Sequence, residues 1–156
     1  MPLVDVLTAA VHVGFFGVAA WLAHIDIREH RLPNAIVGPL TAALALSVVL
    51  VSAVDGSADA PLRSLAGGLI LGAVYLLLRA ASGGGLGGGD VKLAVPIGML
   101  LAWDGWLAFA LGAGLAFVVG SAWAIGMIVS GAGTLRTHIA FGPCMILGAC
   151  LGIALV

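Results

Sequence analysis

Charge is scarce in this sequence. Only 8% of its 156 residues are charged, whereas 62% are apolar and the mean hydropathy is +1.23. A soluble domain carries about 25% charged residues, so this composition excludes an ordinary soluble domain and indicates an integral membrane protein. The net charge is −1 and no basic run occurs, and we therefore expect no nucleic-acid partner.

Cysteine and metal-binding motifs are also scarce. Cys144 and Cys150 lie six positions apart in one apolar run, which places them on different faces of a helix, too far apart for a disulfide. No CxxC pair is present, and the four histidines lack a ligand spacing such as HExxH. We therefore expect neither a metal nor a cofactor.

Long apolar runs make up most of the sequence. A membrane-spanning helix needs about 20 apolar residues. Six candidate spans are separated by polar or glycine-rich breaks: Leu7–Ile25, Ala35–Val54, Leu62–Ala81, Val91–Trp103, Trp106–Ser130 and Ile139–Val156. No basic residue precedes the first span, so we interpret it as permanent rather than as a cleaved signal. The predicted fold is an all-α, six-helix membrane bundle that forms one domain over residues 1–156.

The fourth span is short. As a helix it would reach only about 20 Å, less than the hydrocarbon thickness of a bilayer. Either it takes residues from its neighbours, or Asp90 begins the helix below the membrane surface, beside a water-filled cavity.

The cations predict the orientation. Five of the six Lys and Arg residues fall in the loops that follow spans one, three and five: Arg28, Arg31, Arg79, Lys92 and Arg136. Only Arg63 falls on the other side. The positive-inside rule therefore places these three loops in the cytoplasm and both termini outside.

Two of the seven acidic residues occupy unusual places. Asp5, Asp55, Asp59 and Asp104 fall near the outer side, where we expect solvated charges. On the cytoplasmic side, Asp26 ends the first span and Asp90 starts the fourth, at similar depth in the membrane. Each is explained either as a helix-end charge or as a functional group, because an ionisable residue near the membrane interior is costly.

The glycine run before Asp90 favours the functional interpretation. Six glycines between positions 83 and 89 free the backbone there and leave room for a ligand to lie close by. Two carboxylates that share a site do not both ionise readily, so one keeps a proton. The charged carboxylate can then take a proton from water while the protonated one polarises a peptide carbonyl.

Three motifs resemble those of one protein family. The "GGGD" of Gly87–Asp90 fits the GxGD signature of intramembrane-type aspartic peptidases. "DIREHRLPN", Asp26–Asn34, is similar to the first-aspartate motif of prepilin peptidases, and "HIAFGPCMILGA", His138–Ala149, is similar to the Phe-Gly-Pro segment that opens their last helix. The chain thus resembles the prepilin peptidases, or type IV prepilin leader peptidases, over nearly its whole length.

This resemblance implies an enzyme of the cytoplasmic membrane. Such peptidases remove the short basic leader of type IV prepilins and pseudopilins at the cytoplasmic face, cutting after a glycine that precedes the hydrophobic helix. Asp26 and Asp90 would be the catalytic pair. The motif residues expected to shape the site or contact the substrate are Gly87, Gly88, Gly89, Pro33, Lys92, Phe141, Gly142 and Pro143.

Larger members of the family carry an N-terminal cytoplasmic region with CxxC motifs and also methylate the new N-terminus. This sequence starts with its first span and has no CxxC, so it is similar to the minimal peptidases of tight-adherence pilus systems, and we expect no N-methyltransferase activity. The alternative function is a small proton-coupled transporter that uses Asp26 and Asp90 as a relay. Transporters often show internal repeats and acids deep within their spans, and neither is found here.

Overall fold

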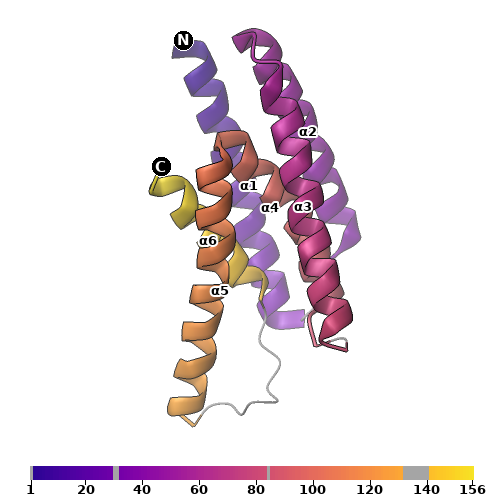
Figure 1. Ribbon diagram of the computed structural model, residues 1–156, viewed down its shortest axis with the longest axis vertical. Coiled ribbons are helices and arrows are strands. Elements are labelled where there is room, and N and C mark those ends of the chain that lie inside the picture. The colour runs from indigo at the N-terminus through magenta and orange to yellow at the C-terminus, as the bar shows by residue number, and fades with distance from the viewer. Residues whose placement is uncertain (1, 30–31, 84, 132–140) are drawn as a thin grey trace.

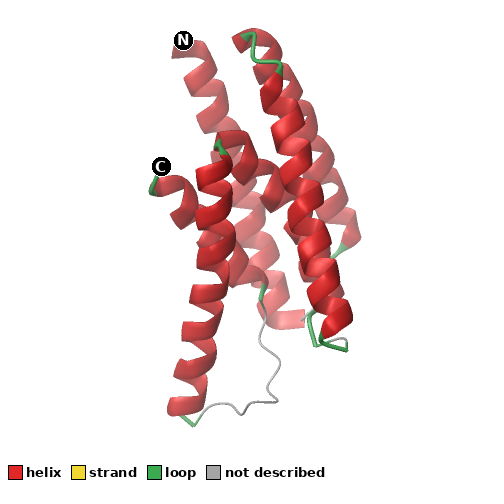
Figure 2. Ribbon diagram, in the orientation of Figure 1, coloured by secondary structure: helices red, strands yellow, loops and turns green. Residues whose placement is uncertain are grey.

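The computed structural model describes residues 2–29, 32–83, 85–131 and 141–156. Within these ranges it contains six helices and no strand (Figures 1 and 2). The helices are α1 (Pro2–Glu29), α2 (Asn34–Asp55), α3 (Asp59–Ala81), α4 (Gly88–Asp104), α5 (Trp106–Val129) and α6 (Gly142–Ala154). The predicted all-α, six-helix bundle is confirmed.

Four helices are long and apolar enough to cross a membrane, namely α1, α2, α3 and α5. The protein is therefore a multi-pass membrane protein. Its first helix continues beyond the predicted end at Ile25, so Asp26 lies within the last turn of α1 instead of ending the span. The last helix begins at Gly142, whereas residues 139–140 of the predicted sixth span lie outside the described ranges.

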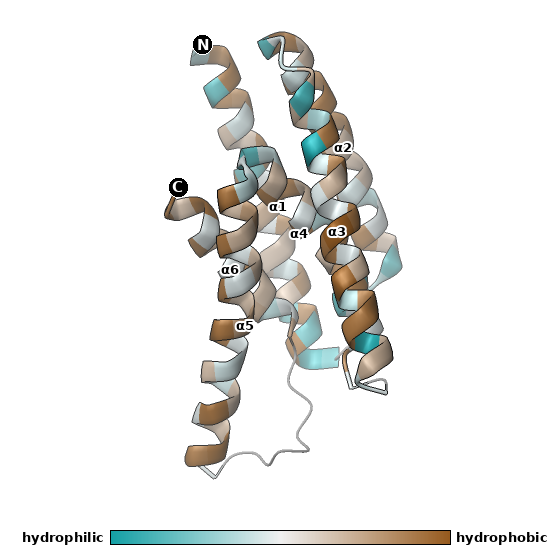
Figure 3. Ribbon diagram, in the orientation of Figure 1, coloured by the Kyte–Doolittle hydropathy of each residue, from teal (hydrophilic) through white to brown (hydrophobic). Residues whose placement is uncertain are grey.

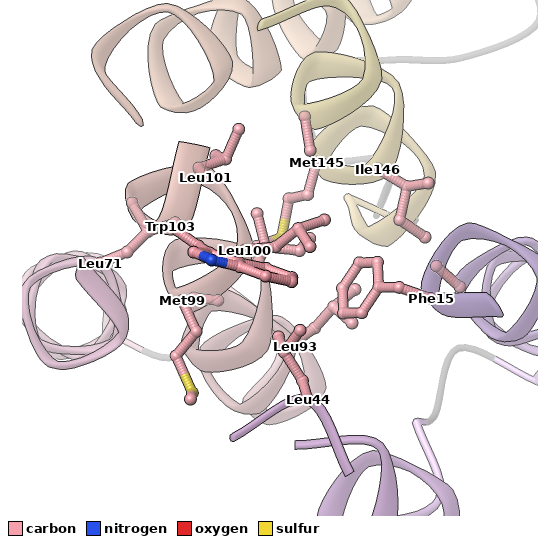
Figure 4. Close-up of a cluster of buried hydrophobic side chains, with 14 of the residues drawn as sticks. Phe15, Leu44, Leu71, Leu93, Met99, Leu100, Leu101, Trp103, Met145 and Ile146 are labelled. Carbon is pink, nitrogen blue, oxygen red and sulfur yellow. The ribbon is translucent and has the colours of Figure 1, made fainter. Parts of the chain in front are cut away.

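Helix α4 is the centre of the bundle. Eleven of its 17 residues are buried, on all of its faces. Figure 4 shows that its side chains meet those of several neighbours, with Leu93 near Phe15 of α1 and Leu44 of α2. A helix enclosed by protein in this way does not need to span the whole bilayer, which accounts for its length of roughly 25 Å.

Small residues allow two helix pairs to pack closely. In the α3–α4 pair, a Cβ added at Gly67 would collide with Ala102 and with the backbone of Gly98. In the α5–α6 pair, a Cβ added at Gly148 or Gly152 would collide with the α5 backbone. Small residues at these positions therefore let the helix backbones approach one another closely.

Polar contacts fix the C-terminal end of α4. Arg63 of α3 donates hydrogen bonds to the carbonyl oxygens of Ala102 and Trp103, at 2.7 and 2.8 Å. These bonds satisfy carbonyls that a helix C-terminus leaves without partners. His12 of α1 pairs with Asp104, with 2.8 Å between Nε2 and Oδ2. Asp104 is thus an exposed charge at the C-terminal end of α4 with His12 as a partner.

The helix ends alternate between the two ends of the bundle. The ends of α1, α3 and α5 lie toward the bottom of Figure 1, whereas both termini and the α2–α3 turn lie in its upper part. Much of the ribbon of α3 and α5 is brown, that is, apolar, in Figure 3, and many large apolar side chains of both helices are exposed, as a lipid-facing surface requires. This alternation agrees with the charge count, and the side that faces the cytoplasm stays a prediction.

Candidate active site

The structure brings the two predicted aspartates together. Asp26 of α1 and Asp90 of α4 are only 6% and 7% exposed, and they are the only buried acidic residues in the described ranges. Their carboxyl groups interact electrostatically, although 64 positions separate them in the chain. Two buried carboxyl groups from different helices thus share one site.

The carboxylate of Asp26 is held by the start of α6. The backbone N–H of Gly142, the first residue of that helix, donates a hydrogen bond to Asp26 Oδ2 at 3.3 Å. The first N–H groups of a helix have no partner within it, and the helix dipole stabilises a negative charge at this end. Pro143, the second residue of α6, suits the first turn of the helix because a backbone N–H there has no acceptor within the helix. The side chain of Pro143 is half-buried.

The carboxylate of Asp90 is held in the same way by its own helix. It accepts a hydrogen bond from the backbone N–H of Gly87, the N-cap of α4. Asp90 is the third residue of α4, and an acidic side chain there commonly reaches back to the N-cap N–H. Each carboxylate of the pair therefore accepts a backbone N–H at a helix N-terminus.

Both carboxylates are also in close contact with a glycine. A Cβ added at Gly142 would lie 2.7 Å from Asp26 Oδ2, and one added at Gly87 would lie 2.9 Å from Asp90 Oδ2. Either distance is too short for a carbon, so a side chain there would displace the carboxylate. The sequence predicted these glycines as site-shaping residues without indicating which atoms they contact.

The loop after α1 packs onto the start of α4. A Cβ added at Gly89 would lie 3.0 Å from the Cβ of Leu32, which is buried. Pro33 is the N-cap of α2, and its carbonyl accepts the N–H groups that open that helix. Lys92 Nζ donates to Asn34 Oδ1 at 2.7 Å, so its described contact links α4 to α2. The two aspartate motifs therefore meet in space.

The glycine run also has a cation beside it. The guanidinium group of Arg79, in the last turn of α3, lies directly against Gly88. A side chain at that position would have to displace this flexible guanidinium group. The other predicted cytoplasmic cations Arg31 and Arg136, and the histidines His30 and His138, lie outside the described residues.

The sequence did not single out Tyr75 of α3 as part of the site. Its side chain is 1% exposed and interacts electrostatically with Asp90 and Cys144. Its ring packs against Phe117 and Phe141, with centroids 5.7 and 6.1 Å away. Two features of the sequence could have pointed to Tyr75: it is the only tyrosine in the chain, and it lies within an apolar span.

The described residues show no group of three or more His, Cys, Asp or Glu side chains that could hold a metal ion. Cys144 and Cys150 are both free thiols, the first buried and the second exposed.

The fold and the site define a helical membrane protein with a buried carboxylate pair. The type IV leader peptidase family matches residues 13–156, and the chain belongs to that family. The resemblance to prepilin peptidases is thereby confirmed, and the protein is a membrane peptidase. Comparison with curated proteins and with solved structures gave no significant match.

Proposed function

We propose that this protein is an aspartic endopeptidase that removes the leader peptide from type IV prepilins or pseudopilins. Membership of the type IV leader peptidase family supports the substrate class. The observation that carries the proposal is the pair of buried carboxyl groups, Asp26 and Asp90, on two separate helices. The whole chain would act as a single membrane-embedded peptidase domain.

In the proposed reaction one aspartate is charged and the other protonated. The charged carboxylate takes a proton from a bound water, and the water oxygen forms a bond to the carbonyl carbon of the scissile peptide. The protonated carboxyl gives its proton to the carbonyl oxygen. The resulting gem-diol then collapses: the carboxyl group that took the proton from water gives it to the leaving nitrogen, the C–N bond breaks, and one hydroxyl of the gem-diol returns its proton to the other carboxylate, so the dyad again holds one proton.

The surroundings of the dyad suit this chemistry. The N-termini of α4 and α6 both direct N–H groups at the site, from Gly87 and Gly142. These dipoles stabilise the negative charge that the reaction needs, and they act more strongly in a buried, low-dielectric site than in water. Neither a metal nor a covalent intermediate is required.

The substrate would reach the site from the bilayer. A prepilin has a hydrophobic helix directly after its basic leader, and we propose that this helix lies beside α1, with the scissile bond at the start of α4 and the leader in the cytoplasm. The cut would follow the glycine at that boundary. The positive-inside count supports a site on the cytoplasmic side of the cytoplasmic membrane. Without a CxxC motif, we propose cleavage without N-methylation.

The test replaces each aspartate by asparagine. Asp26→Asn and Asp90→Asn keep the size of the side chain and remove its acid–base chemistry, so each should reduce cleavage of a co-expressed prepilin below detection. Asp55→Asn, at the opposite end of α2 and exposed, is the matched control and should cleave normally. Cleavage is followed by the size of the pilin, and the membrane content of each variant is measured in parallel. Normal processing by either dyad variant would refute the proposal.

A further inference from the structure

The contacts between α3 and α4 place Tyr75 at the level of the α4 aspartate. The two helices run antiparallel, because Gly72 lies against Val95 while Arg79 lies against Gly88. Tyr75 sits between the two α3 positions, which puts it level with residues 91–92 of α4. These residues directly follow Asp90.

The hydroxyl of Tyr75 is a buried polar group on a ring that packs among apolar side chains. The side chain is 1% exposed, and its ring belongs to an aromatic cluster with Phe117 of α5 and Phe141. Burying a hydroxyl costs free energy unless it gains polar interactions. A phenylalanine would fill the same space without that cost, so the hydroxyl calls for an explanation beyond packing.

The same side chain also supports the other half of the dyad. Phe141 is the N-cap of α6 and directly precedes Gly142, whose N–H donates to Asp26. The ring of Tyr75 packs against Phe141, so it helps to fix the start of α6. One residue therefore lies close to both halves of the dyad: it interacts electrostatically with Asp90, and its ring packs against the residue that precedes Gly142.

We propose that Tyr75 is a positioning residue for the peptidase reaction, whose hydroxyl polarises the Asp90 carboxyl while its ring holds the start of α6 against Asp26. This inference rests on the proposed function. Among the described residues, the ionisable side chains around this site include Asp26 of α1 and Cys144 of α6; Lys92 follows Asp90 by two positions on α4, and Arg79 lies one turn away on α3. Helix α5, which supplies Phe117, has no titratable side chain.

The test compares two variants that each remove one buried hydroxyl from α3. Tyr75→Phe keeps the ring and removes the oxygen near the dyad. Ser64→Ala is the matched control: Ser64 is also 1% exposed and donates to the carbonyl of Met99 at 2.9 Å, about 16 Å further along the helix. Both variants are purified in detergent, and kcat, KM, the pH–rate profile and the thermal unfolding temperature are measured with a prepilin substrate.

A hydroxyl that polarises a charged group contributes enough to change the rate about tenfold. We expect Tyr75→Phe to lower kcat by about that factor with KM nearly unchanged, and to move the acid limb of the pH–rate profile to higher pH. Ser64→Ala should leave kcat and the profile unchanged. Wild-type kinetics in Tyr75→Phe, or a lower unfolding temperature with an unchanged pH profile, would overturn the inference about Tyr75 alone. Failure of the wild-type protein to cleave any prepilin would instead overturn the proposed function.

Discussion

At the residue scale, the site depends on two positions that have no side chain. Gly87 and Gly142 each let a helix N-terminus approach a carboxylate closely enough to donate a hydrogen bond. In both cases the atom that an added Cβ would meet is a carboxylate oxygen of the dyad. A side chain at either position would therefore move a reacting group and leave the helix packing in place.

We predict that Gly142→Ala and Gly87→Ala each reduce cleavage roughly a hundredfold, since misplacing a reacting group by about 1 Å has an effect of that size. The unfolding temperature should change little. The measurements are the cleavage rate on prepilin and thermal unfolding in detergent.

Gly126→Ala is the control for these two variants, because a Cβ at that position of α5 meets nothing within 4 Å. It should cleave at the wild-type rate. Full activity in both Gly142→Ala and Gly87→Ala would show that the close contacts with the carboxylates do not matter for catalysis.

The sequence predicted Asp26 and Asp90 because an acid near the membrane interior stands out in an apolar chain. It could not predict the packing of Tyr75 against Phe141 or the bond from Gly142 to Asp26. These depend on contacts between residues far apart in the chain, 116 positions in the case of that bond. No local pattern encodes such a contact.

At the element scale, α4 depends on α3. Gly67 and Gly98 bring the two backbones together, and Arg63 of α3 binds the carbonyls at the end of α4. The predicted fourth span starts at Val91, three residues after the first residue of α4, because glycine is a poor indicator of a helix. Here Gly88 and Gly89 are helical because tertiary packing outweighs their low helix propensity.

We predict that Gly67→Ala destabilises the protein by about 1–3 kcal/mol, as overpacking of a close-packed interior does. Its added Cβ would collide with Ala102 and with backbone atoms of Gly98, which cannot rotate away. The measurement is the unfolding temperature in detergent.

Gly114→Ala on α5 adds the same methyl group where nothing lies within 4 Å, and it should be neutral or slightly stabilising. Equal unfolding temperatures for the two variants would contradict the close α3–α4 packing.

At the scale of the whole molecule, the bundle places the ends of α1 and α3 and the start of α4 at one end. Helix number and type could be predicted because each apolar run is bounded by charges, glycine or proline. The central position of α4 could not be predicted, since all six runs are similarly apolar. Trp103 of α4 is only 8% exposed, whereas Trp106, three positions later at the start of α5, is 50% exposed. Hydropathy alone therefore does not distinguish a helix in the centre of the bundle from one at its surface.

We predict the orientation from the cations and expect the α2–α3 turn to face the outside of the cell. Single cysteines at Ser57 and Ser82, in a background with Cys144 and Cys150 changed to alanine, report on the two ends of α3. A membrane-impermeant maleimide should label Ser57→Cys in intact spheroplasts and Ser82→Cys only after the membrane is permeabilised. The opposite labelling pattern would invert the topology and place the dyad outside.

The two tightly packed hairpins have a mechanical consequence. Asp90 belongs to the α3–α4 hairpin, whereas Asp26 is held by Gly142 of the α5–α6 hairpin. If α1 moved together with α5 and α6, a sliding of these helices past the α3–α4 pair would separate the two carboxyl groups while the hydrogen bonds within each helix stayed intact.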